Sequence, residues 1–241
     1  MMVERTPPFE PFLEPPLPDD ADWRISQGWY YEPELFDLRD HGAIDFAAGR
    51  GTEVRAAADG YAVATYEEYL WKDEGSESSG SAKETPTVKQ IDGEPIYFGA
   101  GLVVQIWHER GRYTQYGHLH SCNEKIPFFA PRVDEEFVHP DKLRVPVTEY
   151  PRIACRIRAG ERIGTVGMTG MGKGRRTYED WAAGREYTQY EPNHLHFVVC
   201  GRRAPRSRKA ETYDPFGIYG TAEQYSGDTK TWPKLLGTLW K

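Results

Sequence analysis

Residues 102–119 read Leu-Val-Val-Gln-Ile-Trp-His-Glu-Arg-Gly-Arg-Tyr-Thr-Gln-Tyr-Gly-His-Leu. The first six residues form an apolar run that suits a buried strand, and residues 113–119 again have strand character. Gly111-Arg112 separates the two runs, as a turn between neighbouring strands would. We predict an antiparallel hairpin over this stretch, with His118 near the end of its second strand.

The composition of the whole chain favours the same class of structure. The 241 residues include 24 Gly and 18 Pro, together with many Tyr and Thr, and few segments show the long leucine period of a helical bundle. Such a composition is typical of strands joined by turns. A second hairpin is predicted over residues 54–63, with Asp59-Gly60 as its turn. We therefore expect one elaborated domain of mainly β class.

Changes in composition divide the chain into three parts. Residues 1–22 are rich in proline and are expected to form an N-terminal arm or linker without a core face. Residues 23–220 make up the predicted folded domain, interrupted by insertions near 67–99, 121–150 and 173–192. Residues 221–241 form an aromatic C-terminal tail that we expect to pack on this domain.

Charge and cysteine content exclude several classes of protein. The formal net charge of −7 argues against non-specific binding of nucleic acid or an anionic membrane, since clustered Lys and Arg drive such binding. No stretch approaches a membrane-spanning apolar segment, and the N-terminus does not have the pattern of a signal peptide. The cysteines, Cys122, Cys155 and Cys200, follow no CxxC spacing. Each is expected to be a small buried residue, while a disulfide between two of them stays open.

A His-Leu-His sequence, residues 194–196, opens an apolar run near the C-terminal end of the predicted domain. Residues two apart on a strand point to the same face, with Cα atoms roughly 6.6 Å apart. His194 and His196 can therefore stand side by side over one site. One of them can bind a metal ion while the other handles a proton.

A distant His-x-x-x-Asp motif supplies the remaining metal ligands. Catalytic zinc typically has three protein ligands from His, Asp or Glu and one position left for water or substrate. His41, Asp45 and His196 make up such a set. On a straight strand, residues four apart are about 13 Å apart, so the chain must bend between His41 and Asp45. Gly42 makes that bend inexpensive.

His118 and His194 are then left for proton transfer and for stabilising charge on a carbonyl oxygen. A second His-x-His pair, His118 and His120, competes as a metal site, and spacing alone does not separate the two pairs. The 194–196 pair runs into a buried strand, whereas the 118–120 pair runs into a loop, and rigid ligands are expected on the strand. His120 is expected at the rim of the site, His108 as a polar cap of the hairpin, and His139 in an exposed loop.

Five motifs occur in order along residues 23–216. They are His41-Gly-Ala-Ile-Asp45-Phe-Ala, Gly51-Thr-x-Val54-x-Ala-Ala-x-Asp59-Gly60, Tyr116-Gly-His118-Leu, Ile163-Gly-x-Val-Gly-x-Thr-Gly170 and His194-Leu-His196-Phe. Together they resemble the M23 zinc peptidases, the lysostaphin and LytM-type family. The resemblance implies an antiparallel β-sheet core of the barrel-sandwich-hybrid type, with an open groove and long loop insertions. It also implies one zinc ion and cleavage of peptide bonds in bacterial cell-wall cross-links.

Carried over by position, the resemblance makes His41, Asp45 and His196 the ligands of one catalytic Zn²⁺ and makes His118 and His194 the catalytic histidines. It implies a hydrolase of the cell envelope or a secreted one, with peptidoglycan peptides as its partners; a monomer is our default. The long insertions depart from the family. We expect them to wall the groove and to restrict which peptide enters.

The leading hypothesis is a zinc-dependent endopeptidase that hydrolyses peptidoglycan stem peptides or cross-bridges through a zinc-activated water. An alternative is a non-catalytic M23-like protein that binds and activates a cell-wall hydrolase. Such proteins typically lose metal ligands, and this chain keeps them. A third alternative, a sugar-permease phosphocarrier domain, also uses paired histidines in a β-rich fold, but Asp45 as a metal ligand argues against it.

Overall fold

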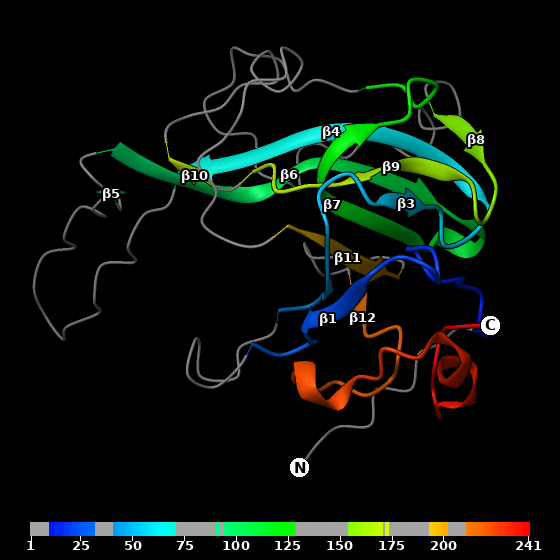
Figure 1. Ribbon diagram of the computed structural model, residues 1–241. Helices are drawn as coiled ribbons and strands as arrows, with labels where there is room; N and C mark the ends of the chain where they lie inside the picture. The colour runs from blue at the N-terminus through cyan, green and yellow to red at the C-terminus, as the bar shows by residue number, and fades with distance from the viewer. Residues whose placement is uncertain are drawn as a thin grey trace, which may run out of the picture.

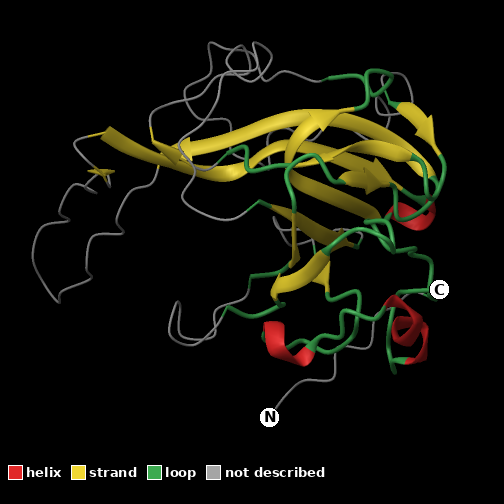
Figure 2. Ribbon diagram, viewed as in Figure 1, coloured by secondary structure: helices red, strands yellow, loops and turns green. Residues whose placement is uncertain are grey.

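The computed structural model consists mainly of strands and turns (Figure 2). It describes residues 10–31, 41–70, 90–91, 94–128, 154–170, 172–173, 193–201 and 211–241. Within these ranges the helical segments are short 3₁₀ turns, namely η1 (Glu109–Gly111), η3 (Ala222–Gln224) and η4 (Thr229–Lys234). The prediction of a mainly β, antiparallel fold is confirmed.

In these ranges the strands form a twelve-stranded sheet with the central order β1-β2-β11-β7-β6-β4-β8 (Figure 1). The bounds of these strands are β1 (Trp23–Gln27), β2 (Ile44–Ala48), β4 (Gly60–Leu70), β6 (Glu94–Trp107), β7 (Tyr113–Cys122), β8 (Cys155–Ile157) and β11 (His194–Cys200). The remaining strands are β3 (Glu53–Arg55), β5 (Gln90–Ile91), β9 (Arg162–Val166), β10 (Gly172–Lys173) and β12 (Thr212–Tyr213). Their pairings are all antiparallel: β3 with β9, β9 with β7, β5 and β10 with β6, and β12 with β11.

Alternation along the strands separates the two faces of the sheet. Leu195, Phe197 and Val199 of β11 are buried in the main hydrophobic core. His194 and His196 alternate with these core residues along the strand. They therefore point to the opposite face. Core side chains of the other central strands include Ile44, Phe46, Ala64, Tyr66, Leu102, Val104, Tyr116 and Leu119. The face that carries Asp45 and His196 is called the histidine face below.

The hairpin predicted over residues 102–119 is confirmed. β6 pairs antiparallel with β7, with Leu102 opposite Leu119 and Trp107 opposite Tyr113. The 3₁₀ turn η1 makes the connection, and Arg110 within it adopts a φ of 62°. The apolar run that indicated a buried strand is buried here because β6 lies between β7 and β4 in the middle of the sheet.

The hairpin predicted over residues 54–63 is wrong. β3 pairs with β9, whereas β4 pairs with β6 and β8, so the two strands are not partners. The link between them includes the buried run of Ala56, Ala57 and Ala58. The amide of Ala57 donates to the Tyr116 hydroxyl at 2.7 Å, which holds the link in the core. The chain thus crosses to another part of the sheet and does not reverse at Asp59-Gly60.

The expectation that residues 1–22 lack a core face is wrong for the part of this segment that the structure describes. Phe12, Leu13 and Leu17 are buried in the main core. The amides of Phe12 and Leu13 both donate to the carbonyl of Leu239, and Leu13 forms a parallel bridge with Trp240. The blue N-terminal segment accordingly lies beside the red C-terminal end in Figure 1. Prolines restrict the backbone of this segment, but the apolar residues between them still pack.

The C-terminal segment packs on the core through aromatic rings. Trp232 and Trp240 lie with centroids 4.7 Å apart, and Phe216 contacts both of them. Asp214 is fully buried beside this cluster and accepts hydrogen bonds from the amides of Phe216, Ile218 and Tyr219. Trp240 stacks on Phe197 of β11 and Trp232 contacts Phe46 of β2, and these two contacts join the segment to the sheet.

The structure also limits the predicted insertions and places the cysteines. β4 continues to Leu70, β6 begins at Glu94 and β7 reaches Cys122, so parts of the segments predicted as insertions are strand. Residues 71–89, 129–150 and 174–192 lie outside the described residues. None of the three cysteines forms a disulfide; Cys200 is buried as expected, whereas Cys122 and Cys155 are half-buried. No helix in the described ranges has the length and apolar character to cross a membrane.

Candidate metal centre

Two neighbouring strands and the turn before them bring the predicted metal ligands together. Asp45 of β2 is directly opposite His196 of β11 in the antiparallel register. His41 lies four residues before Asp45, and Gly42 adopts a φ of 74°, which bends the chain as the sequence required. As a result His41 Nε2 lies 3.4 Å from Asp45 Oδ2. The bend predicted at Gly42 is confirmed.

The His196 ring completes this group. Its Nδ1 lies 2.8 Å from Asp45 Oδ1, and its ring centroid is 4.9 Å from that of His41. One potential ligand atom from each of His41, Asp45 and His196 lies within 4.8 Å of the others. Two ligand atoms held at about 2.1 Å by a tetrahedral ion would lie about 3.4 Å apart, which is close to the His41–Asp45 separation. The donor set and the His41–Asp45 spacing therefore fit a divalent cation, whereas the shorter His196–Asp45 separation is that of a hydrogen bond.

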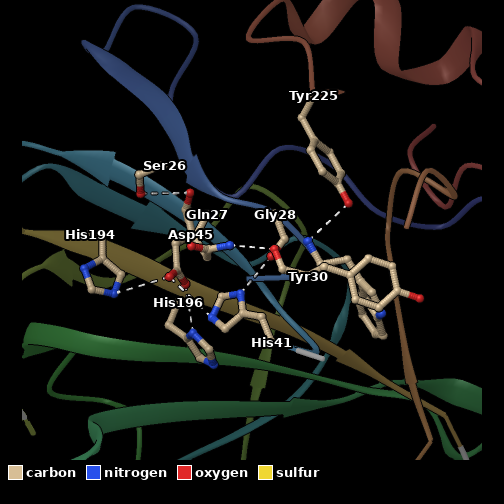
Figure 3. Close-up of polar contacts among 10 residues, drawn as sticks. Ser26, Gln27, Gly28, Tyr30, His41, Asp45, His194, His196 and Tyr225 are labelled. Atoms are coloured by element: carbon tan, nitrogen blue, oxygen red, sulfur yellow. Dashed lines mark hydrogen bonds and ion pairs between the residues drawn. The ribbon is translucent and has the colours of Figure 1, made fainter. Parts of the chain in front are cut away.

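Electrostatics prepares Asp45 to bind a cation. Burial alone would raise the pKa of the Asp45 carboxyl, but His41, His196 and His194 together hold that pKa below its usual range. Figure 3 shows the carboxylate pointing toward all three imidazoles. Asp45 is therefore an anion at neutral pH in a site where few water molecules compete for it.

His41 is held in the form that binds metal. Burial lowers the pKa of its imidazole, which favours the neutral ring. Its Nδ1 lies 2.9 Å from the carbonyl oxygen of Gly28. Because a carbonyl oxygen only accepts, Nδ1 carries the proton and donates it, which leaves the Nε2 lone pair facing Asp45. The backbone selects the tautomer that a metal ligand needs.

His118 and His194 lie beside this group, as predicted. Their ring centroids are 4.6 Å apart, and the His118 ring is 5.6 Å from that of His196. The two side chains are almost fully buried. His194 also places its Nε2 3.7 Å from Asp45 Oδ2. The structure thus brings together all five histidine and aspartate residues that the sequence selected.

The backbone at His118 is unusual and is held by a specific contact. His118 has a φ of 57°, a left-handed conformation that residues with a side chain adopt rarely and often at functional sites. Its Nδ1 donates to the carbonyl oxygen of Thr169 at 2.8 Å, which leaves Nε2 as the proton-accepting nitrogen. Burial, followed by repulsion from His194 and His196, lowers the pKa of His118 to about 3. The ring is therefore neutral at physiological pH.

A network behind His41 was not predicted from the sequence. Residues 28–30 form a short connection whose carbonyl groups hold His41: Gly28 accepts from its ring, and Trp29 accepts from its backbone amide at 2.9 Å. The amide of Trp29 donates to the Tyr225 hydroxyl at 3.2 Å. Tyr225 in turn donates to the buried carboxyl of Asp214 at 2.8 Å.

The fit between this connection and the C-terminal segment is close. A side chain at Gly28 would meet the carbonyl oxygen of Gly220 at 2.5 Å and the Tyr225 ring at 2.7 Å. The amide of Tyr30 donates to that same carbonyl at 3.1 Å. No local sequence signal links residue 225 to residue 28, because the contact depends on how the C-terminal segment folds back.

The other histidines lie away from this group or outside the described residues. His108 is buried, with Nδ1 2.8 Å from the Asp59 carbonyl oxygen and Nε2 2.9 Å from Thr114 Oγ1. Its role is structural, and it lies deeper than the predicted polar cap. His120 is half-buried, with Nδ1 3.4 Å from an Arg50 nitrogen. The prediction for His139 falls outside the described residues.

Comparison with known proteins gives distant matches among solved structures alone. No family model matches the chain, and no curated protein does. Among solved structures, the catalytic domain of a mutant of the prophage-encoded M23 protein EnpA from Enterococcus faecalis matches with 15% identity and a TM-score of 0.41, over 86% of this chain and 95% of that one. The catalytic domain of the antimicrobial peptidase lysostaphin from Staphylococcus simulans matches with 17% identity and a TM-score of 0.42, over 83% and 93%. The chain is similar to both of these structures.

A zinc-containing peptidase from Vibrio cholerae also matches, with 18% identity and a TM-score of 0.40. The match covers 84% of this chain and 39% of that one, so the chain spans well under half of that peptidase. At these identities and scores the likeness assigns no role to any residue. The roles below are therefore argued from the side chains of this chain.

Proposed function

We propose that this protein is a zinc-dependent endopeptidase that cleaves peptide bonds in peptidoglycan stem peptides or cross-bridges. In this proposal His41, Asp45 and His196 hold the metal ion, and His118 and His194 are catalytic. The observation that carries it is the position of two buried imidazoles directly beside a His, Asp, His group with metal-ligand spacing. The ordered motifs that resemble M23 peptidases supply the substrate class.

The donor set suits a catalytic rather than a structural zinc ion. Two neutral imidazoles and one carboxylate make three protein ligands, which leaves one coordination position for water or substrate. Zinc bound there would supply Lewis-acid polarisation of the scissile carbonyl and would lower the pKa of water. Asp45 offsets part of the ionic charge, and the Gly28 carbonyl keeps the His41 ring oriented.

The two remaining histidines are suited to proton transfer. His118 is neutral, donates through Nδ1 to Thr169 and presents Nε2 as a base. His194 lies at the edge of the His118 ring and close to Asp45. From there its imidazole can stabilise negative charge on the carbonyl oxygen of the peptide. Burial of both rings keeps water from competing for these hydrogen bonds.

The test separates ligands from catalytic residues. Purified protein should contain one equivalent of zinc and should release free amines from purified peptidoglycan in a chelator-sensitive way. His196→Ala should lose both zinc and activity, whereas His118→Ala and His194→Ala should keep zinc and lose about 10²- to 10⁴-fold in turnover. His120→Ala is the matched control and should keep both. Protein without bound metal at neutral pH, or equal metal loss in all four variants, would contradict the proposal.

The same proposal places the protein in the cell envelope or outside the cell, where its substrate lies, and treats it as a monomer. Size-exclusion chromatography with light scattering tests the oligomeric state. Cell fractionation with an antibody to the chain tests the location. A protein found only with cytoplasmic markers would contradict the proposed substrate.

A further inference from the structure

One carboxylate on the histidine face takes no part in the metal centre described above. Glu67 lies on β4, where Tyr66 points into the core, so Glu67 points to the opposite face. It is half-buried and is opposite Gly101 of β6 in the register. Its carboxyl group therefore lies on the same side of the sheet as Asp45 and His196.

The separation between Glu67 and the metal centre is set by the order of the strands. β4 is three strands from β11, which carries His196, so the backbones are about 14 Å apart at a strand spacing of about 4.8 Å. The side chains shorten this gap, and the Glu67 carboxyl is close enough for His196 to influence its ionisation. An extended peptide covers roughly 3.3 Å per residue. A group bound at Glu67 would thus be a few residues from the bond that is cleaved.

The backbone of β7 packs closely against His196. β7 carries Gly117 opposite His196, where no side chain stands. A Cβ atom at Gly117 would lie 3.3 Å from the Cβ of His196 and 3.4 Å from that of Ala100. Gly117 is buried, so β7 and β11 are tightly packed beside His196.

Glu67 has no counter-charge in the described part of the chain. No ion pair or hydrogen bond joins its carboxylate to another described residue, and among these residues His196 alone influences its ionisation. Burial raises the pKa of Glu67 to about 7, which shows how poorly water solvates the anion. A partner cation would remove that cost.

Thr65 gives a second, independent observation on the same face. It lies two residues before Glu67 on β4 and is 7% exposed. Its hydroxyl oxygen is buried and has no hydrogen-bond partner. Burying an unpaired hydroxyl is unfavourable, and a valine would fill the same space without that penalty. The fold retains a polar group next to an unpaired carboxylate.

We propose that Glu67 and Thr65 form a subsite for an ammonium group of the substrate, supplied either by a free amino terminus or by a lysine-type side chain. The proposal rests on the proposed function for the peptide nature of that substrate. An ammonium group offers three donors and a positive charge, which matches a carboxylate and a hydroxyl acceptor. The distance from the metal centre makes this a binding subsite and not part of the catalytic group.

Binding of defined peptides tests the subsite. The probes are a lysine-containing tetrapeptide amide and its Nα-acetylated, Nε-acetylated and doubly acetylated forms, titrated by calorimetry into the full chain. A His118→Ala background prevents turnover. The doubly acetylated peptide should bind about tenfold more weakly than the free one, because it lacks the charge-assisted hydrogen bond. The singly acetylated forms show which amine is bound.

Variants of the subsite and one control complete the test. Glu67→Gln keeps the shape and should bind all four peptides with equal affinity, while Glu109→Gln, which removes an exposed carboxylate beyond β6, should keep the tenfold preference. Thr65→Val should weaken binding of the free peptide and raise the melting temperature. A preference that survives Glu67→Gln, or no preference in the parent protein, would overturn the subsite.

The outcome is separable from that of the proposed function. Zinc-dependent cleavage of peptidoglycan without any preference for amines would overturn only the subsite. A preference for amines that depends on Glu67, in a protein that neither binds zinc nor cleaves peptidoglycan, would support the subsite and overturn the proposed activity. If none of the four peptides binds, the subsite is wrong.

Discussion

Replacing Tyr225 by phenylalanine should weaken both the fold and the metal centre. The substitution removes one hydroxyl oxygen and keeps the ring. That oxygen accepts from the amide of Trp29 at 3.2 Å and from the amide of Gly220 at 3.1 Å, and it donates to Asp214 at 2.8 Å. Asp214 would still accept three backbone hydrogen bonds. The two amides would lose this acceptor inside the protein.

The expected loss of stability follows from those two amides. A buried donor that loses its partner costs about 1–3 kcal/mol. Two such donors, partly relieved by small movements of the chain, give an expected decrease of about 2–4 kcal/mol in the free energy of unfolding. Urea unfolding of the metal-free protein at neutral pH measures this value.

The effect on the metal centre is transmitted through residues 28–30. Gly28 accepts from the ring of His41 and Trp29 accepts from its backbone, so a looser connection leaves His41 less well oriented. Loss of outer-shell partners typically costs about 10- to 100-fold in metal affinity. Tyr225 acts one step further away, so we expect up to about tenfold weaker zinc binding. Competition with a chromogenic chelator measures it.

Tyr116→Phe is the matched control for this prediction. The Tyr116 hydroxyl is also buried and accepts from the Ala57 amide at 2.7 Å and from Thr114 Oγ1 at 3.1 Å, but it has no contact with the connection that holds His41. This control should lose stability and keep its zinc affinity. Equal zinc affinity in Tyr225→Phe and the parent protein, or an equal decrease in both variants, would refute the reasoning.

Three further predictions follow from single buried residues. Leu13→Ala should lower the free energy of unfolding by about 2–5 kcal/mol, because this fully buried side chain would leave a cavity; a loss below about 1 kcal/mol in urea would contradict its place in the core. Burial lowers the pKa of His108 to about 4, so the unfolded chain binds more protons between pH 6.5 and 4 and stability falls as the pH falls. At about pH 4.5 burial of His108 lowers the free energy of unfolding by about 2–3 kcal/mol. The variant His108→Gln lacks this titrating group, so between about pH 7 and 4.5 it should lose about 2–3 kcal/mol less in urea titrations than the parent protein. Gly101→Ala should lower turnover at least tenfold and keep zinc. The added Cβ would meet the Thr169 backbone at 2.2 Å and displace the carbonyl that holds His118. Unchanged turnover would contradict this link.

Patterns with a short period predicted the parts of the fold that depend on neighbouring residues. The run at residues 102–107 and the strand at 113–119 pair as expected, because a tight connection leaves little choice of partner. Asp59-Gly60 carries an equally good turn signal and was misleading. There the alternative is a buried link of alanines, whose small side chains allow the backbone to pass through the core.

The candidate site could be predicted from the sequence as far as it depends on residue types and their spacing. Histidines two apart on a strand and a His-x-x-x-Asp motif identify a small set of ligands, and the structure brings that same set within reach of one another. Tyr225, Asp214 and Glu67 were not identifiable. Each is an ordinary residue in sequence; Tyr225 and Asp214 are linked to His41 by hydrogen bonds between distant segments, and Glu67 is placed near the site only by the order of the strands.

The sequence by itself therefore predicted the class of fold and selected the histidines and the aspartate that the structure brings together, because these follow from alternation along strands and from the donor chemistry of His and Asp. Only the tertiary structure decided that the N-terminal segment belongs to the core, which strands are partners, and how the C-terminal segment holds the connection behind His41. These outcomes depend on burial and on hydrogen bonds between residues far apart in sequence. No local sequence pattern predicts these contacts, since each contact stabilises the protein only after both of its segments have folded.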